Sequence, residues 1–265
     1  MSNNINGNIQ EICIQKTSFK GSSSHPFHQL TPDFILNALD ELGYITDSRL
    51  LPLNSYENRV YQIGIQDSSP IIGKFYRPNR WNKKQVLEEH QFCFELVEQE
   101  LPIVAPLISE GGESLFQYKG FHFALFPRKG GYGPELDNLD NLYLLGKLLG
   151  RIHAVGSIRP FSHRNTLNSN TFGYESSKFV SENFIPAELK LSYDSLVKDL
   201  MKTIDEVVSN AGDIQNIRVH GDCHSGNILW RDDNAHFVDL DDAMMAPAIQ
   251  DIWMLLSGNR DRQNA

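Results

Sequence analysis

Residues 217–242 read IRVHGDCHSGNILWRDDNAHFVDLDD, and they are the most informative stretch of the sequence. Its apolar start leads into a His-Gly-Asp motif that ends at Asp222, and Asn227 stands five positions later. A polar turn at 231–234 separates two short apolar runs, and Asp239 follows the second run, twelve positions after Asn227. A tight hairpin brings the three polar side chains to one site. This spacing is typical of a phosphoryl-transfer catalytic loop followed by a magnesium-binding aspartate.

The predicted chemistry explains why these residue types are needed. Transfer of a γ-phosphoryl group depends on positioning and on neutralisation of charge more than on covalent help. Mg²⁺ prefers carboxylate and amide oxygens, so Asp239 and Asn227 are the predicted metal ligands. Asp222 is the predicted catalytic acceptor of the proton from the attacking hydroxyl. His220 is expected to support the loop through hydrogen bonds rather than to titrate.

A lysine lies in the second strand of the hairpin that alternation of apolar residues predicts over 59–76. Taken alone, Lys74 would be an edge-strand lysine that faces solvent. The helix predicted over 82–99, however, carries Glu89 in the middle of its apolar face, where an unpaired carboxylate is costly. A phosphotransferase of this kind needs a strand lysine on the phosphates and a helix glutamate that holds it. We therefore predict a pair between Lys74 and Glu89, with Glu88 as the alternative partner.

The segment before this hairpin, LNSYENR at 53–59, stands where a loop would cover the phosphates. It contains no glycine, which weakens the case for a backbone cradle. Ser55 and Asn58 are expected to contribute side chains instead. The acidic residues 241–242 are candidates for further metal ligands or for a solvated turn. Asp251 is expected either to cap the helix that follows it or to hold the backbone of the catalytic loop.

The order of the elements predicts two lobes. Residues 1–27 are polar and rich in asparagine, which predicts a flexible arm. Strands and one helix over 28–128 predict a small β-rich N-lobe, and helices over 129–265 predict a larger α-helical C-lobe. A cluster of glycine and proline at 127–134 is the predicted linker. The fold class is thus α+β and bilobal.

The remaining elements follow from local signals. Thr31 before a proline predicts a helix start, and that helix is expected to end near Gly43. Further helices are expected over 138–155 and 186–210, and the composition between them, at 157–184, is typical of a loop.

Composition excludes several classes of protein. The 265 residues are 40% hydrophobic and 22% charged, which is enough apolar content for a core. With 24 basic and 33 acidic residues the net charge is −9, which disfavours non-specific binding to nucleic acid. Three widely spaced cysteines indicate reduced thiols. The N-terminus lacks the apolar core of a secretory signal, and no apolar run reaches the length of a membrane helix. We therefore expect a cytoplasmic protein without membrane or nucleic-acid partners.

Several of these segments resemble the stress response kinases of bacteria, a group within the aminoglycoside/choline phosphotransferase branch of the protein-kinase-like fold. The resemblance covers roughly residues 30–258. The segments that carry it are LNSYENRVY at 53–61, GKFYRPNRW at 73–81, LEEHQF at 87–92, VHGDCHSGNILW at 219–230 and FVDLDDAMMAPAIQDIWMLL at 237–256.

The resemblance implies a bilobal fold of the aminoglycoside phosphotransferase type and a serine/threonine protein kinase that uses ATP and Mg²⁺. It also implies a cytosolic monomer that protects cells under envelope or oxidative stress and opposes stress-induced death. Autophosphorylation is one reaction that such a kinase would be tested for.

Functional residues carry over by position. Asp222 matches the proton acceptor, Asn227 and Asp239 match the metal ligands, and Lys74 matches the phosphate lysine. Ser55 matches the place where the covering loop meets ATP. The stretch Leu125 to Arg128 matches the hinge that would hold adenine by backbone groups, so Phe126 and Arg128 are predicted nucleotide contacts.

Departures from the family leave two alternatives open. The family continues with further helices after the LLSG segment at 255–258, whereas this chain stops at Ala265. Without those helices the chain could be an inactive fragment that only binds nucleotide.

The catalytic loop also suits a small-molecule kinase of the aminoglycoside, choline or homoserine type. Only eleven positions separate Asp239 from Asp251, too few for a long activation loop with a phosphorylation switch.

Overall fold

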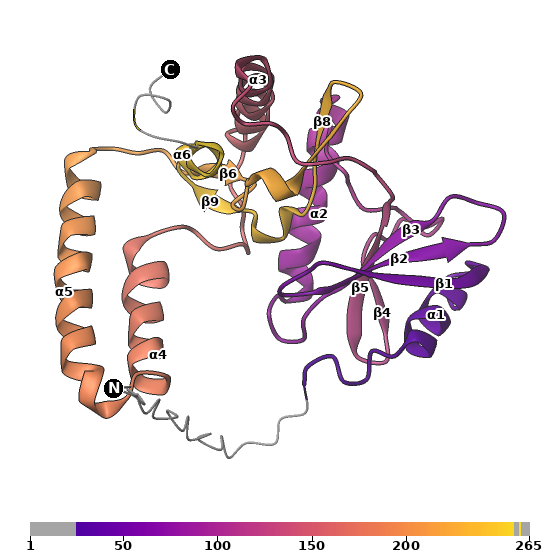
Figure 1. The fold of residues 1–265 in the computed structure, drawn as a ribbon, viewed down its shortest axis with the longest axis horizontal. Helices are drawn as coiled ribbons and strands as arrows, with labels where there is room; N and C mark the ends of the chain where they lie inside the picture. The colour runs from indigo at the N-terminus through magenta and orange to yellow at the C-terminus, as the bar shows by residue number, and fades with distance from the viewer. Residues whose placement is uncertain (1–24, 257–259, 261–265) are drawn as a thin grey trace, which may run out of the picture.

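A computed structural model of the protein describes residues 25–256 and residue 260 (Figure 1). Most of the arm predicted over 1–27 therefore lies outside the described residues. Its last residue, Phe27, is buried, and its ring stacks on Phe121 with the ring centroids 6.0 Å apart. Phe27 thus packs with the sheet rather than in an arm.

The N-terminal half is a five-stranded antiparallel sheet with the order β1-β2-β3-β5-β4. Its strands are β1 (Thr46–Leu53), β2 (Arg59–Ile65), β3 (Ile71–Phe75), β4 (Phe116–Tyr118) and β5 (Phe121–Pro127). Strands β2 and β3 form the predicted hairpin, with Val60 opposite Lys74. Helix α1 (Pro32–Asp40) is capped by Thr31, as predicted, and buries Ile35 and Leu39 in the core of the sheet.

Strand β1 was not predicted. It is mostly exposed, contains a proline, and changes register between Thr46 and Leu50, with Ser48 at a φ of 65°. A strand with these irregularities lacks the alternation that sequence patterns detect.

Helix α2 (Lys83–Glu98) runs between the sheet and the rest of the molecule (Figure 1). The predicted capping box between Asn82 and Gln85 is present. Three apolar residues of α2, Phe92, Cys93 and Leu96, belong to the core of the C-terminal half. Val86 of the same helix packs with Tyr76 and Ala124 of the N-terminal half, so the helix contributes to the cores of both halves.

The C-terminal half contains helices and two short strand pairs. Its elements are α3 (Leu139–Gly156), the π-helical segment η1 (Ser169–Glu175), α4 (Ser176–Asn183), α5 (Ala187–Asn210), β6 (Ile217–Val219), β7 (Ile228–Arg231), β8 (Asn234–Phe237), β9 (Met244–Ala246) and α6 (Ile249–Ile252). Strand β6 pairs with β9, and β7 pairs with β8. The helices predicted over 138–155 and 186–210 are confirmed by α3 and α5.

The prediction of a loop over 157–184 is wrong in its second half, where η1 and α4 form a helical arm with α5 (Figure 1). Asn168 caps this arm by accepting a hydrogen bond from the Thr171 amide. The arm extends away from the sheet, and only Ser181 in α4 and Met201 in α5 are buried. No apolar side chain of η1 or α4 is buried, so residues 169–183 lack the buried apolar stripe by which a sequence pattern identifies a helix.

The segment 127–134 connects the two halves and rests on the C-terminal one. The backbones of Tyr132 and Trp230 exchange two hydrogen bonds of 3.2 and 2.7 Å. Within the part of the chain that the structure describes, none of the helices is both long enough and apolar enough to span a lipid bilayer.

Candidate active site

The predicted catalytic loop begins directly after β6 and is held by a buried carboxylate. Asp251 accepts hydrogen bonds from the backbone amides of His220, at 2.9 Å, and Gly221, at 2.8 Å. His153 on α3 contacts the same carboxylate at 3.0 Å. Burial would raise the pKa of Asp251, but the hydrogen bond from His153, the charge of His220 and these two amides hold it below its usual value. Of the two roles left open for Asp251, the structure selects the one of holding the loop.

The catalytic loop is tied to the segment that leads to Asp239. The Nε2 atom of His220 lies 2.9 Å from the carbonyl oxygen of Val238, so the predicted supporting role of His220 is confirmed. Gly221 has a φ of +87°, and a Cβ atom at this position would lie 2.1 Å from the carbonyl oxygen of Asp242. Only glycine combines this conformation with so close an approach.

Asp222 and Asn227 lie together in the loop. The Asn227 side-chain nitrogen donates to the Asp222 carbonyl oxygen at 2.9 Å and to its carboxylate at 3.2 Å. His224 lies 3.5 Å from the same carboxylate. Because both hydrogen bonds of the Asn227 side chain use its nitrogen, its oxygen is available to a cation.

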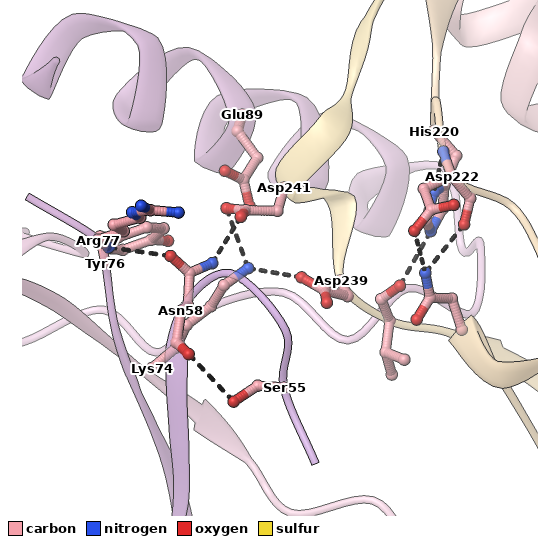
Figure 2. A network of polar contacts seen from close by, with 12 residues as sticks. Ser55, Asn58, Lys74, Tyr76, Arg77, Glu89, His220, Asp222, Asp239 and Asp241 are labelled. Carbon is pink, nitrogen blue, oxygen red and sulfur yellow. Dashed lines mark hydrogen bonds and ion pairs between the residues drawn. The ribbon is translucent and has the colours of Figure 1, made fainter. Parts of the chain in front are cut away.

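Asp239 follows the β7–β8 hairpin in a left-handed conformation, with a φ of 61°. Such a conformation is uncommon for a residue other than glycine and is often found at functional sites. The turn leaves the side chain about half exposed, at 49%, and places its carboxylate 2.6 Å from Nζ of Lys74 (Figure 2). The charge of Lys74 holds the pKa of Asp239 below its usual value.

Lys74, on β3, has a side chain that is only 6% exposed. Besides Asp239 it contacts Asp241, at 3.1 Å. Burial alone would lower the pKa of Lys74, but these carboxylates outweigh burial and hold it well above the ordinary value. The ammonium group is therefore charged and paired.

The predicted pairing of Lys74 with a glutamate of α2 is wrong for this structure. Glu88 instead accepts hydrogen bonds from the backbone amides of 162–164. Glu89 is buried near Lys74, but among the described residues its only cation within 4.0 Å is Arg164, at 3.8 Å. Burial raises the pKa of Glu89 to about 7. The turn at 239–242 brings nearer carboxylates to the lysine, and a helix projection cannot foresee that turn.

Two residues at the site were missed or left unassigned. Asp241 is buried and accepts a 2.6 Å hydrogen bond from the Asn58 side chain. The Arg164 guanidinium donates to the backbone oxygens of Asp241 and Ala243. Arg164 stands in a segment without periodicity, so no local pattern identifies it. For Asp241, the only indication of a role at the site was its position in the acidic run that follows Asp239.

A cavity of about 320 Å³ lies between the sheet and the C-terminal half. One part of its lining is apolar and includes Val60, Ile72 and Phe126, while Lys74, Asn227 and Asp239 line it together with Ser55. The structure thus brings most of the predicted site residues to one cavity.

Two predicted nucleotide contacts do not line this cavity. Asn58 is buried behind it, with its amide nitrogen on Asp241 and its amide oxygen on the backbone N–H of Arg77. Arg128 is exposed, and its Nε donates to the side chain of Gln62 at 2.7 Å. Phe126 and Pro127 line the cavity, so the hinge prediction stands for these residues and not for the Arg128 side chain.

The donor atoms at this site suit a hard cation. The Asp239 carboxylate and the Asn227 amide oxygen are the ligand types that Mg²⁺ accepts. In the described ranges, no group of three or more His, Cys, Asp or Glu side chains is placed to hold a metal by itself. A cation here would complete its shell with water and phosphate oxygens, which is usual for Mg²⁺ in nucleotide sites.

Comparison with known proteins places this geometry in context. Residues 49–265 match the family described as "Phosphotransferase enzyme family". The chain is 45% identical to stress response kinase A of Escherichia coli (strain K12) over 248 residues, which cover 91% of this chain and 73% of that protein. It is 44% identical over 238 residues to "Serine/threonine protein kinase RdoA" of Salmonella typhimurium, covering 89% of this chain and 71% of the relative.

Solved structures give the same fold. The structure described as "Amicoumacin kinase hAmiN in complex with AMP-PNP, Ca2+ and Ami" superposes with a TM-score of 0.69 at 21% identity. It covers 84% of this chain and 68% of that one. At this identity the likeness concerns the fold alone, and it confirms the predicted α+β bilobal class.

Proposed function

This chain belongs to the phosphotransferase enzyme family, and from that premise we propose that it transfers the γ-phosphoryl group of ATP to a serine or threonine hydroxyl of a protein. The observation that carries the proposal is the convergence of Lys74, Asp222, Asn227 and Asp239 in and beside one cavity. The named relatives support a kinase.

Each group has a role that fits its surroundings. Lys74, charged and buried, binds the α- and β-phosphates. Asp222 accepts the proton of the attacking hydroxyl and orients that hydroxyl. The oxygens of Asn227 and Asp239 hold Mg²⁺, which when bound neutralises the charge that develops on the transferred phosphoryl group. The apolar part of the cavity, between β2, β3 and β5, accommodates the adenine ring.

The finer parts of the proposal rest on the relatives. A protein acceptor and a role in the stress response are supported by the names of the similar proteins. We further propose that the enzyme acts in the cytoplasm as a monomer and that the lobes meet near residue 128.

The proposal is tested by following phosphate incorporation by intact mass. Purified protein is incubated with Mg·ATP, with and without a generic protein acceptor, beside an Asp222→Asn variant of equal melting temperature. We expect phosphate on serine or threonine, of the acceptor or of the chain itself, with the wild type and at least a hundredfold less with the variant.

The alternatives give different outcomes. Turnover of an amino alcohol, a sugar or an aminoglycoside without protein phosphorylation would indicate a small-molecule kinase. A rise in melting temperature with Mg·ATP and no transfer to any acceptor would indicate a nucleotide-binding protein only. Either result would contradict the proposal of a protein kinase.

A further inference from the structure

We propose that Asp241, fixed in place by Asn58, is the carboxylate that positions Lys74 while nucleotide is bound. This positioning role rests on the phosphotransferase function proposed above. It assigns to Asp241 the task that the sequence led us to expect of Glu89.

The two carboxylates that contact Lys74 differ in their other contacts, because only Asp239 is a candidate metal ligand. Asp239, 2.6 Å from the ammonium nitrogen, is about half exposed at the cavity and is the candidate metal ligand. A carboxylate that coordinates a cation gives up much of its attraction for a neighbouring lysine. Asp241, 3.1 Å from the same nitrogen, has a side chain only 8% exposed. The second ion pair is therefore the one that persists when a metal binds.

Asp241 is held on the sides that do not face the lysine. Its Oδ2 atom accepts the 2.6 Å hydrogen bond from Asn58, which leaves Oδ1 directed to Lys74 (Figure 2). Its backbone oxygen accepts from the buried guanidinium of Arg164. A carboxylate fixed in this way is preorganised and costs little reorganisation when the lysine binds phosphate.

Asn58 suits this task because its amide has one donor end and one acceptor end. The nitrogen donates to Asp241, and the oxygen accepts from the backbone N–H of Arg77, just after β3, at 3.0 Å (Figure 2). The Ser55 hydroxyl donates to the carbonyl oxygen of Asn58 at 3.1 Å. The loop before β2 is thereby connected to the turn that carries Asp239 and Asp241.

Glu89 is less well placed for the same task. Of the described cations, Arg164 is the one within 4.0 Å of its carboxylate, at 3.8 Å, whereas Asp241 lies 3.1 Å from Lys74. In Figure 2 it lies beside Asp241 with no contact drawn to Lys74. A buried carboxyl group whose pKa is raised to about 7 also carries only part of a charge at neutral pH.

The test compares isosteric variants by their dissociation constants for Mg·ATP and for adenosine, together with KM and kcat for transfer. We expect Asp241→Asn to weaken Mg·ATP binding at least tenfold and to leave adenosine binding within twofold. General damage to the fold would weaken both ligands. Glu89→Gln, which neutralises the other buried carboxylate at the cavity, should weaken Mg·ATP binding less than Asp241→Asn does.

A swap of donor and acceptor tests the role of Asn58. Asn58→Asp keeps the contact with the Arg77 amide but places two carboxylates together, so we expect at least a tenfold loss in kcat/KM for ATP. The double variant Asn58→Asp with Asp241→Asn restores a hydrogen bond in the reverse direction but leaves Lys74 without the Asp241 carboxylate. Its kcat/KM for ATP should therefore stay at least tenfold below that of the wild type.

The inference is overturned if Glu89→Gln harms Mg·ATP binding more than Asp241→Asn does, or if the double variant regains the wild-type kcat/KM for ATP without a carboxylate at position 241. In those cases the wild type still transfers phosphate, and the proposed function stands. If the wild type binds no Mg·ATP, the proposed function fails and the inference fails with it.

Discussion

Acidification should weaken the folded state through His90, a buried histidine on α2 beside the active site. Its Nε2 atom lies 2.9 Å from the Tyr76 hydroxyl and its Nδ1 atom lies 2.8 Å from the Ser114 hydroxyl. The residue is 1% exposed, and burial lowers its pKa from 6.5 to about 3. Lys74 and Arg164 act in the same direction, because a second positive charge here would repel theirs.

The sign and size follow from proton linkage. Below pH 6.5 His90 is protonated in the unfolded chain, whereas in the folded chain it becomes protonated only near pH 3. Stability from this group is thus complete above pH 6.5 and declines as the pH falls. For each pH unit between about 6.5 and 3, the contribution of His90 to the free energy of unfolding changes by about 1.4 kcal/mol. Between pH 7.5 and pH 5.0 the contribution of His90 to the free energy of unfolding should fall by about 2 kcal/mol, equivalent to about 4–8 °C in melting temperature for a protein of this size. Glu89, whose pKa is raised to about 7, changes the stability in the opposite direction over this range, so the effect of His90 is read from the difference between wild type and variant.

The assay is urea unfolding at pH 7.5 and at pH 5.0, for the wild type and for His90→Gln. The variant lacks the titrating group, so its loss of stability over this range should be smaller than that of the wild type by about 2 kcal/mol. His163→Gln, which removes an exposed imidazole, is the matched control and should keep the wild-type loss. Equal losses for the wild type and His90→Gln would refute the reasoning.

Three further predictions concern named contacts. Asp239→Ala should abolish Mg²⁺-dependent transfer while the melting temperature stays near that of the wild type, and near-normal turnover would show that the metal assignment is wrong. Glu88→Gln should lower the free energy of unfolding by about 1–2 kcal/mol in urea titrations, because a charged acceptor of three backbone amides is lost; an unchanged midpoint would contradict this. Gly221→Ala should remove activity and cost about 2 kcal/mol or more, since the new Cβ meets a carbonyl oxygen at 2.1 Å. Gly43→Ala, with a φ of +83° but open space around it, is the matched control and should cost about 1 kcal/mol; equal costs at the two glycines would exclude the clash as the cause.

Much of the fold could be predicted because local signals agree with the final structure. Thr31 and Asn82 cap their helices as their side chains predict, and the alternation over 59–76 gives the β2–β3 hairpin. The fixed spacing of Asp222, Asn227 and Asp239 is set by a short hairpin, so it predicts their convergence in space. In each case the contact that stabilises the element lies close in sequence.

The residues that were not predicted depend on contacts between distant segments. Lys74 meets Asp241 across 167 positions, which follows from the left-handed turn at Asp239 and not from any repeat in the chain. Arg164 reaches that turn from a segment without regular structure. The helix projection correctly buried Glu89, but burial alone does not identify a partner.

The proposed chemistry requires Asn227 and Asp239 to lie at the same site, but it does not require a fixed length for the hairpin that connects them. Strands β7 and β8 are joined by Asp232 and Asp233, both exposed and both with positive φ, at the far end from the site. Extra residues inserted at this tip would lengthen the chain between the two ligands without displacing either of them. The tip is therefore a permissive position for an epitope or a fluorescent reporter. A search for related enzymes that demands twelve positions between these ligands would overlook any in which this tip has grown.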